Sequence, residues 1–259
     1  MTKYITLFKC SLTAQMIFRF NFFIEYFSKL IRLMVKIFLW QAIVMSLPKG
    51  SDISIKFIVT YFVFAFIIEE MTGADTQIAA KIKAGTLSND LLKPVNVVGL
   101  EFSRVVAEKL MTVVKFIPAM VAILLIYHRY VMAPDINIWV ILLVLLGFVV
   151  NFFIMLTLHV IAFWVTEVYA LGFVILTFFG IFSGNLIPYE FLPDSMKMIF
   201  ELLPFKFLIH IPVNAVMGRL DTQHIYICLL QAAGYIGIFS LVNYLLFRNG
   251  IKKYTSMGG

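Results

Sequence analysis

The stretch IWVILLVLLGFVVNFFIMLTLHVIAFWV, residues 138–165, decides what kind of protein this is. It contains no Lys, Arg, Asp or Glu, and a helix of about 20 apolar residues crosses the hydrocarbon core of a bilayer. A helix over the whole stretch is longer than that core, so it has to tilt or extend beyond the hydrocarbon. The stretch therefore predicts a transmembrane helix.

The composition of the whole chain agrees with this interpretation. Of its 259 residues, 62% are hydrophobic and 14% are charged, whereas soluble domains are roughly 45–50% apolar and about 25% charged. A soluble fold of this size cannot bury that apolar surplus, and the 27 Phe and 11 Tyr exclude a disordered chain. The sequence predicts an all-α polytopic membrane protein that forms a single transmembrane domain over residues 1–259.

Apolar segments and the breaks between them predict the domain organisation. We expect six transmembrane helices, over residues 22–47, 53–71, 105–127, 138–165, 168–187 and 225–247. Residues 1–20 have one apolar face and one Lys-bearing face, which predicts an interfacial amphipathic helix. Residues 188–222 hold four prolines and no apolar run long enough to cross, which predicts an external segment of interfacial or re-entrant helices.

The net charge of +7 indicates orientation rather than a nucleic-acid partner. With the N-terminus inside, most Lys and Arg residues fall on the cytoplasmic side, as the positive-inside rule requires. We therefore expect both termini in the cytoplasm and the protein in the plasma (inner) membrane, in contact with lipid. The sequence has no glycine-rich loop ending in Gly-Lys-Ser/Thr, and Cys10 and Cys228 make no metal-ligand spacing. We expect no catalytic residues, metal or cofactor in this chain.

Charged residues follow one helical face at two places. One stripe consists of Glu25, Lys29, Arg32 and Lys36, and the second of Glu101, Arg104, Glu108 and Lys115. A charge at the centre of a membrane costs about 2.5–3.5 kcal/mol, so such side chains face protein or water. They either snorkel to the headgroups and pair across helices, or Lys29, Arg32 and Lys36 line a water-filled vestibule with Glu101 or Glu108 as partners.

The polar segment of residues 72–104 carries apolar residues that a solvated linker does not need, namely Ile82, Leu87, Leu91, Leu92 and Val95. Its centre, KIKAGTLSNDLLKPVN over residues 81–96, predicts a short helix, a break at Gly85, a second helical turn and a stop at Pro94. The pattern favours docking onto a partner at the membrane surface, and an interfacial helix resting on lipid is the alternative.

Two stretches resemble a known family. AGTLSNDLLKPVN (residues 84–96) is similar to the cytoplasmic loop of permease subunits of ATP-binding-cassette (ABC) type-2 exporters. FSGNLIPYEFLP (residues 182–193) is similar to the segment after their fifth helix, and shorter matches occur at residues 4–8, 19–22, 38–40 and 203–205. The resemblance implies a permease with a connecting helix at residues 1–20, a coupling segment at 72–104 and a re-entrant external segment at 188–222.

The resemblance also implies partners. Two copies of a separate ATPase would bind ATP and Mg, and a second copy or a related permease would complete the substrate pathway. We expect coupling to the ATPase through apolar docking and a fixed loop geometry, by Lys83, Gly85, Thr86, Leu87, Leu91, Lys93 and Pro94.

Two alternative functions remain open. One is a secondary transporter that works without an ATPase. The other is an intramembrane metalloprotease, because Glu69-Glu70 and the His210–Asn214 spacing resemble parts of such a site, although Ala74 stands where that family has Arg. The basic stripe leaves the chemical nature of the transported substrate open.

Overall fold

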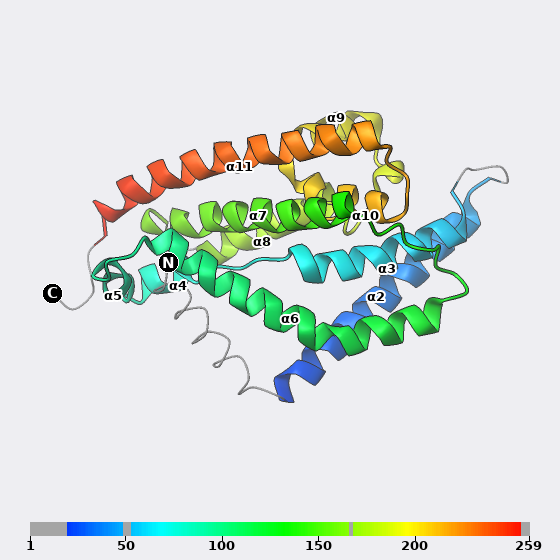
Figure 1. The fold of residues 1–259 in the computed structure, drawn as a ribbon, viewed down its shortest axis with the longest axis horizontal. Helices are drawn as coiled ribbons and strands as arrows, with labels where there is room; N and C mark the ends of the chain where they lie inside the picture. Colours follow the sequence, from blue (N-terminus) through cyan, green and yellow to red (C-terminus); the bar gives the residue numbers. More distant parts are fainter. Residues whose placement is uncertain (1–19, 49–52, 166–167, 255–259) are drawn as a thin grey trace.

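The computed structural model describes residues 20–48, 53–165 and 168–254, and these form a bundle of helices (Figure 1). Most of the described residues lie in helices, and no strand occurs among them. The prediction of an all-α fold is confirmed. The interfacial helix predicted for residues 1–20 lies outside the described part of the chain, apart from Phe20.

One helix, α3 (Ile55–Thr72), lies at the centre of the bundle. Its residues from Ile58 to Ile68 are buried on every side of the helix, which is typical of a core helix rather than an amphipathic one. Its neighbours are α2 (Phe20–Ser46), α6 (Val97–Tyr127), α7 (Ile138–Val160) and α10 (His210–Val216). The remaining helices are arranged around this core.

The apolar stretch that begins at Ile138 forms α7, which lies alongside α11 (Thr222–Ile251) in Figure 1. Asn137 begins α7 by accepting hydrogen bonds from the amides of Trp139 and Val140, and a 3₁₀ turn, η1 (Ile161–Phe163), follows its end. Asp221 caps α11 in the same way, because its side-chain carboxylate accepts a hydrogen bond from the His224 amide at 3.1 Å. The helix predicted for residues 225–247 is therefore longer at both ends.

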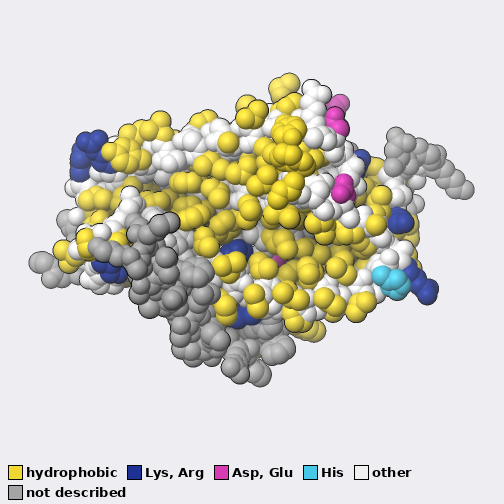
Figure 2. Space-filling view, viewed as in Figure 1, with side chains coloured by type: hydrophobic (Ala, Val, Ile, Leu, Met, Phe, Trp, Pro, Cys, Tyr) yellow, Lys and Arg dark blue, Asp and Glu magenta, His cyan; other side chains and the backbone are white. Residues whose placement is uncertain are grey.

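Three of the described helices are long and apolar enough to cross a membrane: α6, α7 with η1, and α11. The others expected to span do not meet that test. Both α2 and α3 carry at least three charged residues over any 18-residue length, and α8 (Val168–Phe182) has 15 residues. Figure 2 shows hydrophobic side chains covering most of the visible face, with charged side chains mainly toward its ends. A membrane-embedded protein follows, while six spans remain a prediction.

Residues 188–222 fold into short helices, as their prolines predict. These are η2 (Tyr189–Phe191), α9 (Asp194–Leu202), η3 (Pro204–Phe207) and α10. The chain bends by 74° between α9 and the helical stretch Pro204–Val216. Such a bend is the geometry of a broken span or of a re-entrant loop, so the external re-entrant placement stays a prediction.

Helix α8 ends at Phe182 rather than at the predicted residue 187, because the chain turns sharply at Gly184. Gly184 has a φ of 83°, in the left-handed region that glycine adopts without strain. The Tyr61 hydroxyl donates to the Gly184 carbonyl at 2.9 Å, and the Leu186 amide donates to the Gly180 carbonyl at 2.9 Å. These bonds close the helix end and direct the following loop into the bundle.

We expect Gly184→Ala to lower the free energy of unfolding by at least about 1–2 kcal/mol, the usual cost of a left-handed residue with a side chain. The added Cβ would also meet the Tyr61 hydroxyl at 2.4 Å. Gly234→Ala in α11 is the matched control, because nothing lies within 4 Å of its Cβ. Thermal unfolding of the purified chain in detergent measures both variants, and equal melting temperatures would contradict this account of the turn.

Candidate functional site

The C-terminal end of α3 lies inside the bundle. Figure 1 shows the helix ending short of α4 (Ile78–Lys83), and residues 73–76 continue without helix. The last carbonyl groups of a helix have no partner within it. Here the Lys109 ammonium donates to the Glu70 carbonyl at 2.8 Å, and the Asn151 amide donates to the Thr72 carbonyl at 3.0 Å. A cation at this position is also favoured by the helix dipole.

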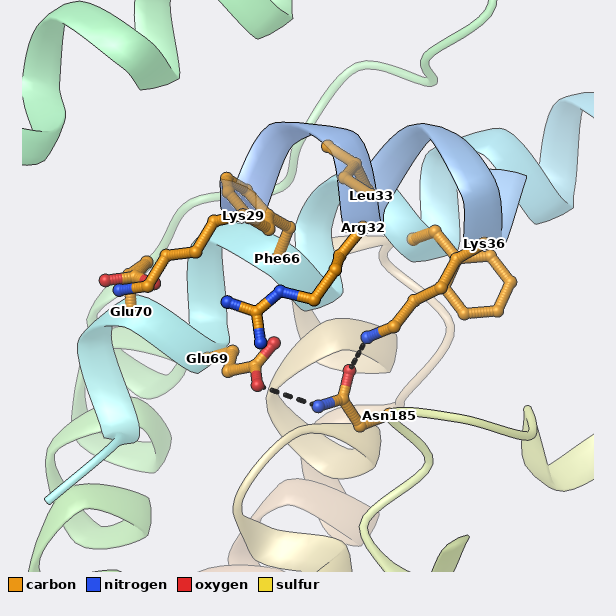
Figure 3. A pocket seen from close by; sticks show the side chains of 9 residues that line it. Lys29, Arg32, Leu33, Lys36, Phe66, Glu69, Glu70 and Asn185 are labelled. Carbon is orange, nitrogen blue, oxygen red and sulfur yellow. Dashed lines mark hydrogen bonds and ion pairs between the residues drawn. The ribbon is translucent and has the colours of Figure 1, made fainter. Parts of the chain in front are cut away.

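A polar cavity of about 70 Å³ adjoins this helix end (Figure 3). It lies between α2, α3 and the loop after α8, and is lined by Lys29, Arg32, Leu33, Lys36, Phe62, Phe66, Glu69, Glu70 and Asn185. Lys29 and Glu70 form an ion pair at 2.8 Å. We call this space the polar cavity.

Asn185 connects the two helices across the polar cavity. Its side-chain oxygen accepts a hydrogen bond from the Lys36 ammonium at 2.6 Å, and its amide nitrogen donates to the Glu69 carboxylate at 2.8 Å. A neutral amide therefore stands between the Lys36 cation and the Glu69 anion. The sharp turn at Gly184 is what brings Asn185 to this position.

The structure brings Lys29, Arg32 and Lys36 together on one face of α2, as their spacing predicts. The expected partners are different. Glu101 and Glu108 lie in another network, and Glu69, Glu70 and Asn185 take their place. From the sequence, Glu69 and Glu70 were considered only as part of a metal site. Asn185 was not predicted as a site residue, although it lies within the FSGNLIP motif.

Glu101 and Glu108 belong to an ion-pair network that joins α4, α5 (Leu87–Leu91) and α6. Lys81 donates to Asp90 at 2.7 Å and also pairs with Glu101, which is fully buried. The network is completed by pairs of Arg104 with Glu101 and Glu108, and of Lys93 with Asp90. Because these charges come from three helices, the network fixes the short helices α4 and α5 to the first turns of α6.

The coupling segment follows the predicted order of helix, break, turn and stop. Gly85 has a φ of 71° between α4 and α5, and Pro94 follows α5 on the surface. Thr86, Leu91 and Lys93 are also exposed, whereas Lys83 is half-buried.

Leu87 corrects one expectation about this segment. Its side chain is 0% exposed and packs with Ile78, Val97 and Phe148, so it supports the segment from inside and is not available to a partner. Leu92 is 85% exposed and Leu91 36%. Sequence reasoning noted Leu92 as apolar but did not include it among the coupling residues.

Comparison with known families assigns the chain. A family model described as ABC-2 family transporter protein matches residues 30–258. The chain belongs to the ABC-2 transporter family. This makes it a membrane permease component of an ABC-type transporter, and the match includes the polar cavity residues from Arg32 to Asn185 as well as the whole coupling segment. Comparisons with curated proteins and with solved structures gave no match.

The residues that suggested a metalloprotease have other contacts in the permease. Glu69 is bonded to Asn185, Glu70 is paired with Lys29, and His210 contacts the amide of Asn214. Within the described residues, no group of three or more His, Cys, Asp or Glu side chains is arranged to hold a metal ion. Nothing in this part of the permease favours the metalloprotease alternative.

The ion-pair network predicts a pH dependence. Burial raises the pKa of Asp90, but the hydrogen bonds from Lys81 and Lys93 outweigh it and hold the pKa below its ordinary value of 3.8. The Asp90 carboxylate therefore stabilises the folded state fully above about pH 4, and this contribution is lost as the pH falls through the lowered pKa.

We expect Asp90→Asn to destabilise the permease by about 1.5–3 kcal/mol at neutral pH, the range for a hydrogen bond to a charged group. Melting temperatures of both proteins in detergent, measured from pH 8 downward, test this. The difference should stay constant to about pH 5 and shrink below the ordinary aspartate pKa of 3.8. A constant difference throughout the acid range would show that the charge of Asp90 is not what stabilises the segment.

Proposed function

We propose that the permease is the membrane subunit of an ATP-driven exporter. In this proposal it forms the substrate pathway with a second copy or a related permease, and two copies of a separate ATPase bind ATP and Mg. The observation that carries the proposal is the exposed edge formed by residues 91–94, which we call the docking edge, on a segment that ion pairs fix to α6. Family membership supports the transport role.

The docking edge has the features of a protein contact. Figure 1 places α4 and α5 at one end of the bundle, near the end of α11. Leu92 is almost fully exposed there, followed by Lys93 and Pro94. Single exposed leucines are common on protein surfaces, but here Leu91 and Leu92 are neighbours that are both exposed, while Leu87 of the same segment is buried. A partner that covers Leu91 and Leu92 removes apolar surface from water.

The ion pairs offer a way to transmit movement from the docking edge. A displacement of α5 acts on Asp90 and Lys81, and Lys81 is paired with Glu101 of α6. Two turns further along α6, Lys109 is bonded to the end of α3 beside the polar cavity. Closure of the ATPases against the docking edge would therefore shift α6 and change the polar cavity. This is our proposal for the coupling mechanism.

The charged face of α2 supports a pathway between two permeases. Arg32 is exposed on a helix whose other exposed residues include Ile31, Met34 and Val35. An arginine that faces lipid within the hydrocarbon is costly, so this face of α2 is expected to lie against water or a second permease. The distribution of Lys and Arg supports the plasma membrane orientation with both termini in the cytoplasm.

We expect Leu92→Asp to reduce retention of the ATPase at least about tenfold, because a carboxylate replaces apolar surface in the contact. The tagged full-length chain is purified from native membranes in mild detergent. The co-purifying protein is identified by its nucleotide-binding loop, and ATP hydrolysis by the complex is measured.

Met198→Asp is the matched control. Met198 is 79% exposed, close to the 85% of Leu92, but it lies in α9 at the opposite end of the bundle. This variant should retain the ATPase. Transport by the purified chain alone, without a nucleotide-hydrolysing partner, would contradict the proposal and point to a secondary transporter.

A further inference from the structure

We propose that the polar cavity binds an anionic group, a phosphate or carboxylate carried by the molecule that the permease moves. The inference rests on the proposed function, since it identifies the substrate class for the pathway of that transporter. The chemistry is the same whether the anionic group belongs to an amphiphile or to a soluble molecule. The arguments are the charge of the polar cavity, its free donors, its size and its apolar wall.

Positive charge is in excess around the polar cavity. Three basic residues and two acidic residues line it. One pair, Lys29 with Glu70, is in direct contact at 2.8 Å. This leaves Arg32 and Lys36 facing the single carboxylate of Glu69. Lys109 of α6 adds a further cation at the Glu70 carbonyl.

Among the residues that the structure describes, neither of these two cations forms an ion pair with a carboxylate. Lys36 gives its hydrogen bond to the neutral oxygen of Asn185, and Asn185 in turn occupies an oxygen of Glu69. None of the ion pairs between described residues includes Arg32. Figure 3 shows its guanidinium pointing from α2 into the polar cavity, on the side of Glu69. A guanidinium is the donor group that best matches the two oxygens of a phosphate or carboxylate.

Taking a cation out of water costs free energy unless an anion compensates its charge. A cation held in a membrane protein is expensive without a compensating charge. The polar cavity holds one more cation than its own acids neutralise, and of the two cations Lys36 is half-buried whereas Arg32 is exposed. An incoming anion would accept hydrogen bonds from Arg32 and Lys36 and complete the balance. Charge-assisted hydrogen bonds of this kind are about twice as strong as neutral ones.

The size and walls of the polar cavity suit a small head group. A single water needs about 10–15 Å³ of cavity volume, so a volume of about 70 Å³ admits several waters or one compact anionic group. Leu33, Phe62 and Phe66 form the apolar part of the lining. A ligand with an anionic head and an apolar remainder would satisfy both parts.

Binding is measured on the full-length chain in phosphatidylcholine vesicles, without any ATPase. The chain has three tryptophans, and replacing Trp139 and Trp164 by Phe leaves Trp40 as the reporter. Trp40 donates to the Leu186 carbonyl at 3.0 Å, next to Asn185. The probes are dodecyl phosphate, dodecyltrimethylammonium with the same tail and opposite charge, and millimolar inorganic phosphate.

We expect a saturable change in Trp40 fluorescence with dodecyl phosphate and none with the cationic probe. Arg32→Gln and Lys36→Gln should each weaken binding about tenfold, the effect of losing one charge-assisted hydrogen bond. Glu69→Gln should strengthen it, because it removes the competing carboxylate. Lys56→Gln is the matched control, since Lys56 is an exposed cation on α3 outside the polar cavity. Unaltered melting temperatures show that the variants are folded.

The probes also identify the source of the anion. Binding of dodecyl phosphate alone supports an amphiphile, and binding of inorganic phosphate as well supports a soluble anion. Equal responses to both charged amphiphiles, or an unchanged dissociation constant in Arg32→Gln and Lys36→Gln, would overturn the proposal. Because no ATPase is present, such a result would leave the permease role intact, and loss of ATPase coupling would leave anion binding intact.

Discussion

The C-terminal end of α3 lies inside the bundle, and the surrounding helices are arranged to satisfy it. The end carries unpaired carbonyl groups and the carboxylates of Glu69 and Glu70, all of which are costly to bury without partners. Their partners come from four different elements: Lys29 on α2, Lys109 on α6, Asn151 on α7 and Asn185 in the loop after α8. Removing any of these elements would leave a buried polar group unpaired. The polar cavity exists because these groups meet without filling the space between them.

Helix α6 connects this interior to the surface of the molecule. Its first turns carry Glu101 and Arg104, which hold α4 and α5, and Lys109 lies further along the same helix at the end of α3. The helix continues through Pro118 without interruption. In the proposed mechanism, coupling a soluble motor to a membrane pathway requires an element of this kind, which links α4 and α5 to the end of α3 beside the polar cavity. ATP-driven export makes use of this connection in the proposed mechanism.

Part of this organisation was predictable from the residues. The all-helical fold, the start of α7 and the common face of Lys29, Arg32 and Lys36 follow from apolar runs and from spacings of three and four. The sequence did not predict the partners of these three cations. Glu69, Glu70 and Asn185 lie far from them in sequence, and many other acidic residues were equally possible partners. The orientation of Leu87 was also missed. A helix of only five residues has too little periodicity to show which of its leucines is buried.

The sequence by itself determined that this protein is a helical membrane protein with a polar segment between its apolar helices, because hydrophobic surplus and helical period are local properties of the chain. It also contained the motifs that place it in the ABC-2 transporter family. Only the tertiary structure decided that α3 ends in the interior, that Asn185 bridges Lys36 and Glu69, and that Leu92 rather than Leu87 faces outward. These outcomes depend on the cost of leaving charges and carbonyl groups unpaired in the interior. That cost is determined only when distant segments come together.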